Sequence, residues 1–185
     1  MDYKKPTPSL VQEKVKEHEQ DLETVDTDTA LTLLIQTFPK NQAIHDVLLK
    51  VAAINQLYSA GLKTTAIYGV SKLIRGLDID PKLAQGSLDV VDEIAYGLVA
   101  GENDRYAFAT KYCHWHRPDF YPICDTNARD VLRLCKEVDA FADFRLVDFY
   151  KYPLYKGIIE AFVRHYGLSA FSFRQLDKFL WRYNQ

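Results

Sequence analysis

Hydrophobic residues recur along this chain with the period of an α-helix, and polar or turn-forming residues divide them into segments. The clearest segment spans residues 42–60, where the 3.6-residue period is carried by Ile44, Val47, Leu48, Val51, Ala52, Ile54 and Leu57. No segment alternates with the two-residue period of a half-buried strand. Further helices are predicted over residues 9–23, 30–38, 64–74, 87–98, 153–165 and 173–183, with a short one opened by Asp80-Pro81. The pattern predicts an all-α fold of about eight to ten helices.

The chain length limits the number of domains. At 185 residues, the chain is long enough for one well-packed core. Residues 1–8 hold two prolines, two lysines and few apolar side chains, so we expect a disordered tail there. We expect residues 9–185 to form a single compact helical domain.

Residues 107–135 predict a helix, a short loop and a second helix. Pro118 and Pro122 cannot continue a helix and push the residues before them towards an extended conformation. Asp125 is a favourable N-cap for the second helix, because its carboxylate accepts hydrogen bonds from free backbone N–H groups. Lys111 lies on the order of 7 Å along the helix axis before the break. We therefore expect the Lys111 amine and the Asp125 carboxylate to share one cleft.

Composition and charge narrow the classes of function. No run approaches the ~18 apolar residues of a membrane helix, and the N-terminus lacks the apolar core of a signal peptide, so we expect no membrane association. Three widely spaced cysteines argue against a disulfide framework and fit a reducing, cytoplasmic location. The net charge is −2, but residues 103–185 carry thirteen Lys or Arg and ten Asp or Glu. The candidate catalytic half is therefore the positive half.

The segment Thr110-Lys111, a proline-containing loop, Ile123-Cys124-Asp125-Thr126 and Arg129-x-x-x-Arg133 resembles the catalytic segment of the helix-hairpin-helix DNA glycosylases. The similarity is greatest to the 8-oxoguanine DNA glycosylase and endonuclease III branch, and it covers roughly residues 98–136. The resemblance implies an all-α glycosylase-type domain that excises an oxidised or modified base, with or without AP lyase activity. Three cysteines exclude the four-cysteine iron–sulfur cluster of some relatives, and we expect no cofactor.

The resemblance also implies roles for particular residues. Lys111 would be the amine nucleophile, and Asp125 the carboxylate that stabilises the sugar cation. Trp115, one turn after Lys111, could supply an apolar wall, and an extruded base could stack on Trp115 or Tyr121. The remaining candidates for binding DNA are Arg129 and Arg133 at phosphates and the pair Asn55-Gln56 in the gap of the duplex. The partner would be double-stranded DNA with a modified base, bound by a monomer.

Other interpretations stay open. The expected phosphate-binding hairpin is degenerate, because only Gly101 is present and Glu102 and Asp104 are acidic. Asp125 also fits a simple N-cap, and Lys111 a surface lysine. The alternative is a catalytically inactive helical module that binds DNA or a protein; a helical interaction protein with an accidental likeness is the third. Cys113, His114, His116 and Cys124 match no standard zinc spacing, so we expect no metal.

Overall fold

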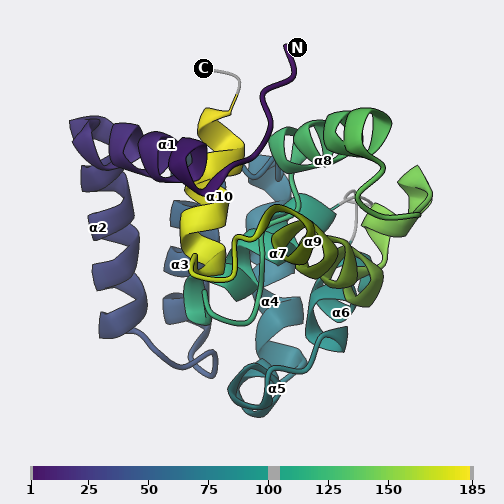
Figure 1. Ribbon diagram of the computed structural model, residues 1–185. Coiled ribbons are helices and arrows are strands. Elements are labelled where there is room, and N and C mark those ends of the chain that lie inside the picture. Colours follow the sequence, from purple (N-terminus) through teal and green to yellow (C-terminus); the bar gives the residue numbers. More distant parts are fainter. Residues whose placement is uncertain (1, 100–104, 184–185) are drawn as a thin grey trace. The chain divides into compact units, whose positions relative to one another are not determined.

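The computed structural model describes residues 2–99 and 105–183, and this part of the chain is helical with no strand (Figure 1). The all-α prediction is confirmed. In chain order the elements are α1 (Pro8–Gln20), α2 (Leu22–Thr37), α3 (Ile44–Leu57), η1 (Thr64–Ala66), α4 (Ile67–Gly76), α5 (Ile79–Gln85), α6 (Asp89–Tyr96), α7 (Tyr106–His116), α8 (Thr126–Asp139), η2 (Leu146–Tyr150), α9 (Tyr152–Tyr166) and α10 (Phe173–Arg182). None of the described helices has the length and hydropathy needed to cross a membrane.

The helices group into two units. Unit 1 combines the described parts of Met1–Asp26 and Pro122–Gln185, and unit 2 is Thr27–Tyr121. Unit 1 is therefore discontinuous in sequence, with unit 2 inserted between its two parts. The predicted boundaries, a disordered tail over residues 1–8 and one domain over 9–185, stay predictions.

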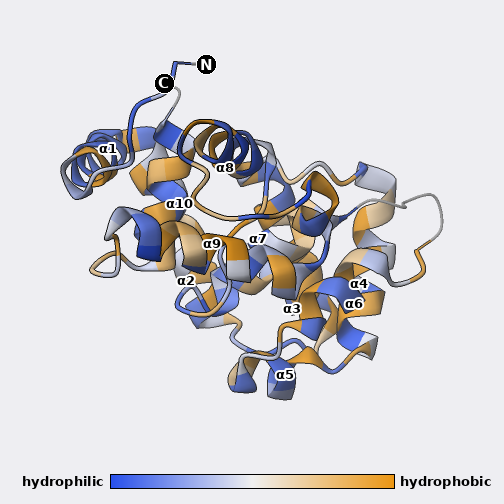
Figure 2. Ribbon diagram, turned by 45° about the vertical axis from the view of Figure 1, so that its right-hand side comes forward, coloured by the Kyte–Doolittle hydropathy of each residue, from blue (hydrophilic) through white to orange (hydrophobic). Residues whose placement is uncertain are grey.

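Unit 1 is built on the packing of α1 against α10, with α8 also packed on α10 (Figure 1). Figure 2 shows orange hydrophobic and blue hydrophilic residues on both α1 and α8, as expected of amphipathic helices. Two apolar residues of α1, Val11 and Val15, are buried, as are Leu176 and Phe179 of α10. This face-to-face burial joins the two ends of the chain.

The segment before α1 is attached to the end of the chain by hydrogen bonds. The Tyr183 hydroxyl accepts from the Lys4 backbone N–H at 2.7 Å and donates to the Lys4 carbonyl at 2.6 Å. The Asp139 carboxylate accepts from the hydroxyls of Tyr3 and Tyr166. The hydrogen bond from Tyr3, followed by that from Tyr166, lowers the pKa of Asp139. These contacts hold the N-terminal segment in unit 1.

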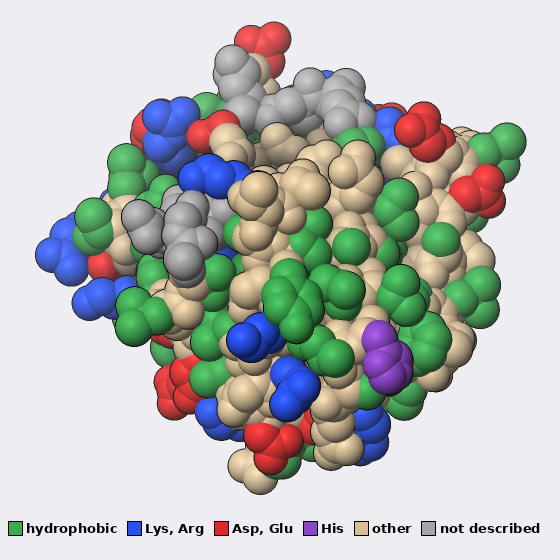
Figure 3. All heavy atoms as spheres, turned by 180° about the vertical axis from the view of Figure 1, so that it is seen from behind, with side chains coloured by type: hydrophobic (Ala, Val, Ile, Leu, Met, Phe, Trp, Pro, Cys, Tyr) green, Lys and Arg blue, Asp and Glu red, His purple; other side chains and the backbone are tan. Residues whose placement is uncertain are grey.

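Unit 2 is built on α3, which packs against α4 and α7, and on the pair α6 and α7. Its core contains aliphatic side chains such as Val47, Val51 and Ile54 of α3, all fully buried. Some apolar side chains of this unit stay at the surface, among them Leu49 and Tyr68. Figure 3 shows a face on which hydrophobic side chains gather near the centre beside lysine and arginine.

A buried lysine fastens the connection between α2 and α3. Lys50 is fully buried, and its Nζ donates to the carbonyls of Phe38 at 3.0 Å and Lys40 at 2.8 Å and to Asn41 Oδ1 at 2.7 Å. Tyr112 donates its hydroxyl to the same Asn41 oxygen at 2.6 Å. Burial lowers the pKa of Lys50 to about 8. The ammonium therefore satisfies two backbone carbonyls of the connection that follows α2.

The predicted helix boundaries agree best where a cap is visible in the sequence. Asp125 caps α8, as predicted, Ser172 caps α10, and α7 ends at His116 before the first proline. The main difference is α2, which begins at Leu22 rather than near residue 30. The Thr- and Asp-rich stretch at its start has weak helix propensity and little periodicity, so local rules favour a cap there.

Candidate functional site

The lysine predicted as nucleophile lies on the most buried helix of unit 2. Nine residues of α7 are buried, among them Lys111, which is 6% exposed. The Lys111 Nζ donates a hydrogen bond of 2.9 Å to the Tyr58 carbonyl. Carbonyls at the end of a helix lack intrahelical partners, and the helix dipole is negative there, so a cation is favoured. Lys111 is therefore held at the C-terminal end of α3.

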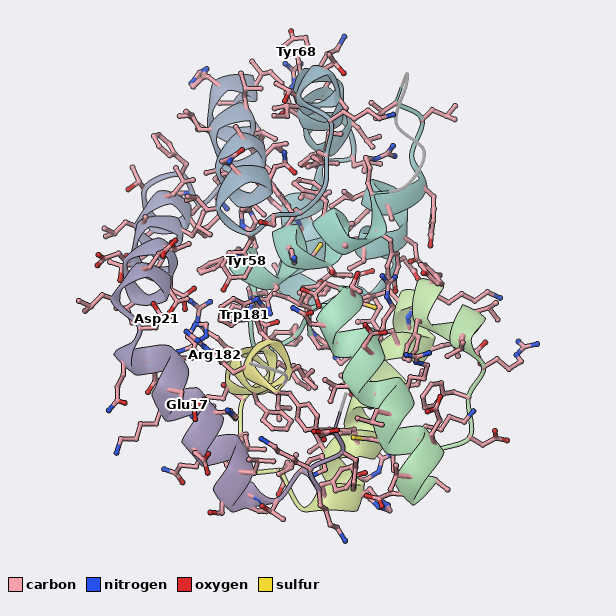
Figure 4. All side chains as sticks on the ribbon, turned by 90° about the horizontal axis from the view of Figure 1, so that it is seen from above. Glu17, Asp21, Tyr58, Tyr68, Trp181 and Arg182 are labelled. Atoms are coloured by element: carbon pink, nitrogen blue, oxygen red, sulfur yellow. The ribbon has the colours of Figure 1, made fainter. Side chains whose placement is uncertain are left out.

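Tyr58 connects Lys111 to two further side chains of unit 2. It is the C-cap residue of α3, and its hydroxyl donates to Asp28 Oδ1 at 2.9 Å. The rings of Tyr58 and Trp115 meet edge to face with centroids 5.2 Å apart, and the Lys111 Nζ lies 5.9 Å from the Tyr58 centroid. Asp28 is 9% exposed, so a carboxylate, a phenol and an amine share a largely buried site. Figure 4 labels Tyr58 among the side chains of unit 2.

Asn55, predicted to enter the gap of a DNA duplex, fastens the loop that follows α3. Its Nδ2 donates to the Leu62 carbonyl at 3.1 Å, and its Oδ1 accepts from the Leu62 N–H at 2.8 Å. Within that loop Ser59 and Gly61 have positive φ values of 45° and 83°. The amide of Asn55 thus closes a tight turn, while its neighbour Gln56 is exposed. The predicted DNA contact of the pair stays a prediction, carried more readily by Gln56.

Asp125 lies in unit 1 and begins α8. Its Oδ1 accepts a hydrogen bond of 3.1 Å from the Ala128 N–H, as an N-cap does, and the residue is half-buried. Lys111 belongs to unit 2 and Asp125 to unit 1. Their predicted meeting in one cleft stays a prediction.

The two arginines predicted to bind phosphate lie one turn apart on α8. Arg129 donates to Thr126 Oγ1 at 3.2 Å, and its guanidinium lies 5.0 Å from the centroid of the Tyr150 ring. The Arg133 side chain is 52% exposed, with Asp130 at 3.7 Å. Arg133 can exchange its exposed ion pair for a ligand at modest cost, because exposed ion pairs are weak, whereas Arg129 is half-buried.

The two aromatic residues predicted to stack on a base are buried. Trp115 is 5% exposed and packs on Tyr58. Tyr121 is fully buried, and its hydroxyl donates to the Ser87 carbonyl at 2.9 Å. Burial raises the pKa of Tyr121. In the arrangement described, both residues pack the interior of unit 2, and a stacking role for either stays a prediction.

No metal centre is built by the histidines and cysteines near α7. His114 Nδ1 lies 2.7 Å from the Tyr121 carbonyl, and Cys113 is fully buried with its pKa raised by burial. Over residues 2–99 and 105–183, no three His, Cys, Asp or Glu side chains form a group that could hold a metal ion. The degenerate hairpin at Gly101, Glu102 and Asp104 lies outside the described residues.

Sequence reasoning missed Tyr58 and Asp28. Neither is near Lys111 along the chain, since Asp28 lies in α2 and Tyr58 at the end of α3. The one local signal is the position of Tyr58 beside the turn at Ser59 and Gly61, where a helix must end and present its last carbonyls. Only the packing of α7 on α3 shows that Lys111 is the lysine that donates to one of these carbonyls.

Comparison with known proteins identifies the family. Residues 10–120 match the model of the HI_0787_N family, described as an N-terminal domain. The chain is also 35% identical over 155 residues to an uncharacterized protein of Haemophilus influenzae, covering 83% of this chain and 71% of that protein. The chain therefore belongs to the HI_0787_N family. No solved structure matches it.

The family segment and the candidate site overlap only in part. The segment ends at residue 120, one residue before the end of unit 2, and so contains Lys111, Tyr58 and Asp28. Asp125 follows it. The likeness to the Haemophilus protein spans more residues than the family segment holds, so it includes residues beyond 120.

Proposed function

We propose that this chain is a DNA glycosylase of helix-hairpin-helix type that excises an oxidised or modified base, with Lys111 as the amine nucleophile. The observation that supports the proposal best is the buried Lys111 amine on α7, held 2.9 Å from the Tyr58 carbonyl. Lysine side chains are seldom buried to this degree, and burial sets the Lys111 amine apart from the exposed lysines of the chain. The substrate is double-stranded DNA, bound by a cytoplasmic monomer.

The proposed reaction uses the two predicted catalytic groups in sequence. The neutral Lys111 amine attacks C1′ of the deoxyribose, and the C1′–N bond breaks with its electron pair leaving on the base. The Asp125 carboxylate stabilises the positive charge that develops on the sugar and accepts the proton released by the amine. Asp125 then passes that proton to the leaving base. The C1′–O4′ bond of the sugar ring opens as the Lys111 nitrogen forms a C=N bond, and the second proton of the amine passes through Asp125 to O4′. A neutral base and a Schiff base on Lys111 result. Borohydride reduces that Schiff base to a stable amine, which makes it detectable.

A second candidate is a catalytically inactive module that binds DNA or a protein. It is favoured by the structural roles of both groups, since Asp125 caps α8 and Lys111 serves the C-terminal end of α3. An enzyme and an inactive module can share these structural roles of Lys111 and Asp125, but only the enzyme forms a covalent adduct with DNA. The test must therefore detect that adduct directly.

The test is borohydride trapping on duplexes that contain 8-oxoguanine, uracil, other modified bases or an abasic site, with alkali cleavage in parallel to detect base removal alone. We expect a covalent adduct with the wild type and none with Lys111→Ala, while Lys72→Ala, which changes an exposed lysine of α4, behaves as wild type. Asp125→Asn keeps an N-cap of equal quality, so a loss of activity there is chemical rather than structural. The absence of both adduct and base loss on every duplex would favour the inactive module.

A further inference from the structure

The surroundings of Lys111 form a connected set within unit 2. The Lys111 amine donates to the Tyr58 carbonyl at 2.9 Å, and the Tyr58 hydroxyl donates to Asp28 Oδ1 at 2.9 Å. Trp115, from the same helix as Lys111, fixes the Tyr58 ring from its edge. Three helices thus converge on one residue, with Asp28 from α2, Tyr58 at the end of α3 and the lysine from α7.

Hydrogen bonds of the residues before and after Tyr58 in the sequence fix the orientation of its carbonyl. On the helix side, the Tyr58 N–H donates to the Ile54 carbonyl at 3.1 Å and so continues the α3 ladder. On the loop side, the two hydrogen bonds of Asn55 to Leu62 hold the turn closed. A carbonyl at a helix end that is fixed in this way is a directed acceptor for a cation.

Asp28 secures the side chain of Tyr58. At 9% exposure, the carboxylate is largely withdrawn from water, and a hydrogen bond to an ionised acceptor is stronger than one between neutral groups. A tyrosine hydroxyl that loses such an acceptor in a buried place is left partly unsatisfied and the ring gains freedom. The position of the Tyr58 main chain therefore depends on Asp28.

We infer that Asp28, Tyr58 and Asn55 are positioning residues that hold the Lys111 amine in a resting position. This inference rests on the proposed function, in which Lys111 is the nucleophile. We call these three residues the holder. To attack, the amine must leave the Tyr58 carbonyl, so the stability of the holder controls how readily Lys111 reacts. A lysine that only covers the end of α3 would not have a reactivity set by a carboxylate two contacts away.

The experiment measures the reactivity of Lys111 without DNA. The folded chain is briefly methylated with formaldehyde and cyanoborohydride, and the modification of each lysine is quantified by mass spectrometry of peptides. Lys72, exposed on α4, is the internal reference for reagent access, and the fully buried Lys50 reports opening of unit 2. The variants are Asp28→Asn, Asp28→Ala and Tyr58→Phe.

Matched controls are present in the chain. Asp26→Ala changes an exposed aspartate of α2, and Tyr68→Phe an exposed tyrosine of α4. Figure 4 shows Tyr58 and Tyr68 well separated in unit 2. Neither control touches the holder, so both should label Lys111 as the wild type does.

We expect Asp28→Ala and Tyr58→Phe to raise methylation of Lys111 about fivefold, the effect of one net hydrogen bond. Asp28→Asn should raise it less than Asp28→Ala does, because its amide oxygen still accepts from the hydroxyl but carries no charge. Equal methylation of Lys111 in all variants would overturn the inference. An equal rise at Lys50 would also overturn it, since the residues would then stabilise unit 2 as a whole.

Borohydride trapping on an abasic duplex separates this inference from the proposed function. If wild type forms no adduct, the proposed function fails, while the methylation order still decides whether the holder exists. If wild type does form an adduct, Asp28→Ala should raise the trapping rate about fivefold with unchanged affinity for the duplex, and Asp28→Asn should raise it less. A change in affinity alone would contradict a positioning role.

Discussion

Replacing Lys50 with methionine removes the ammonium that three oxygen atoms share at the junction of α2 and α3. Methionine keeps most of the aliphatic volume, so the change tests the hydrogen bonds rather than packing. The carbonyls of Phe38 and Lys40 and the Asn41 side chain would lose donors at 3.0, 2.8 and 2.7 Å. The connection would then lack its main fastening.

The magnitude follows from how well each acceptor can be satisfied otherwise. A hydrogen bond to a charged group contributes about 1.5–3 kcal/mol net. Water can replace the ammonium at Phe38 and Lys40, which are partly or fully exposed, and Asn41 Oδ1 keeps the Tyr112 hydroxyl at 2.6 Å. Removing a buried charge also recovers part of its desolvation cost. We therefore expect a loss of about 2–3 kcal/mol, well below the sum of three bonds.

The two tryptophans allow unit 2 to be observed separately. Trp115 lies in unit 2 and Trp181 in unit 1. In a Trp181→Phe background, urea unfolding followed by fluorescence reports unit 2, where the midpoint should fall by roughly 1 M for a slope of about 2–3 kcal/mol per M. Lys72→Met, on the exposed face of α4, is the control. A Lys50→Met variant within about 0.5 kcal/mol of that control would refute the reasoning.

Three further predictions concern other parts of the chain. Burial lowers the pKa of His116 to about 3 from 6.5, and its Nε2 has no hydrogen-bond partner among the described residues. The unfolded chain therefore binds the proton first, so stability present above pH 6.5 is lost as the pH falls towards 3, by at most about 1.4 kcal/mol per pH unit. His116→Gln should flatten that slope in urea titrations, and an unchanged slope would count against the buried neutral imidazole. Gly86→Ala should destabilise unit 2 by about 1–3 kcal/mol in the same assay, since φ is +69° and a Cβ would meet Phe120 at 2.6 Å; a neutral result would contradict that contact. Asp139→Ala should lower the melting temperature by roughly 2–4 °C, and Tyr3→Phe should do so less, because Tyr166 still holds the carboxylate; equal effects would argue against a shared acceptor.

Features decided by neighbouring residues could be predicted from the sequence. The end of α7 before Pro118, the Asp125 cap and the capping box at Ser172 each follow from the chemistry of a few adjacent residues. Gly167 likewise ends α9 with a φ of 67°. In these places one backbone conformation is strongly favoured, and a few adjacent residues determine it.

Features decided by distant residues could not be predicted. Asp28 reaches Tyr58 only because α2 continues past the expected cap, and Tyr58 reaches Lys111 only because α7 packs on α3. Asn55 closes the loop that follows α3, a role that depends on the positive φ values after the helix, while its predicted contact with DNA stays a prediction. The burial of Lys50 depends in the same way on three oxygen atoms that only the fold assembles.

The discontinuity of unit 1 has a consequence during translation. α1 ends at Gln20, but its packing partner α10 begins only at Phe173. At about 5–20 residues per second, a ribosome takes roughly 8–30 s to make the intervening chain. Throughout that time Val11 and Val15 have no partner helix to cover them, although unit 2 is complete once Tyr121 has been added. A nascent chain of this topology thus offers chaperones an early amphipathic helix with an uncovered apolar face, and premature termination anywhere before α10 leaves that face exposed.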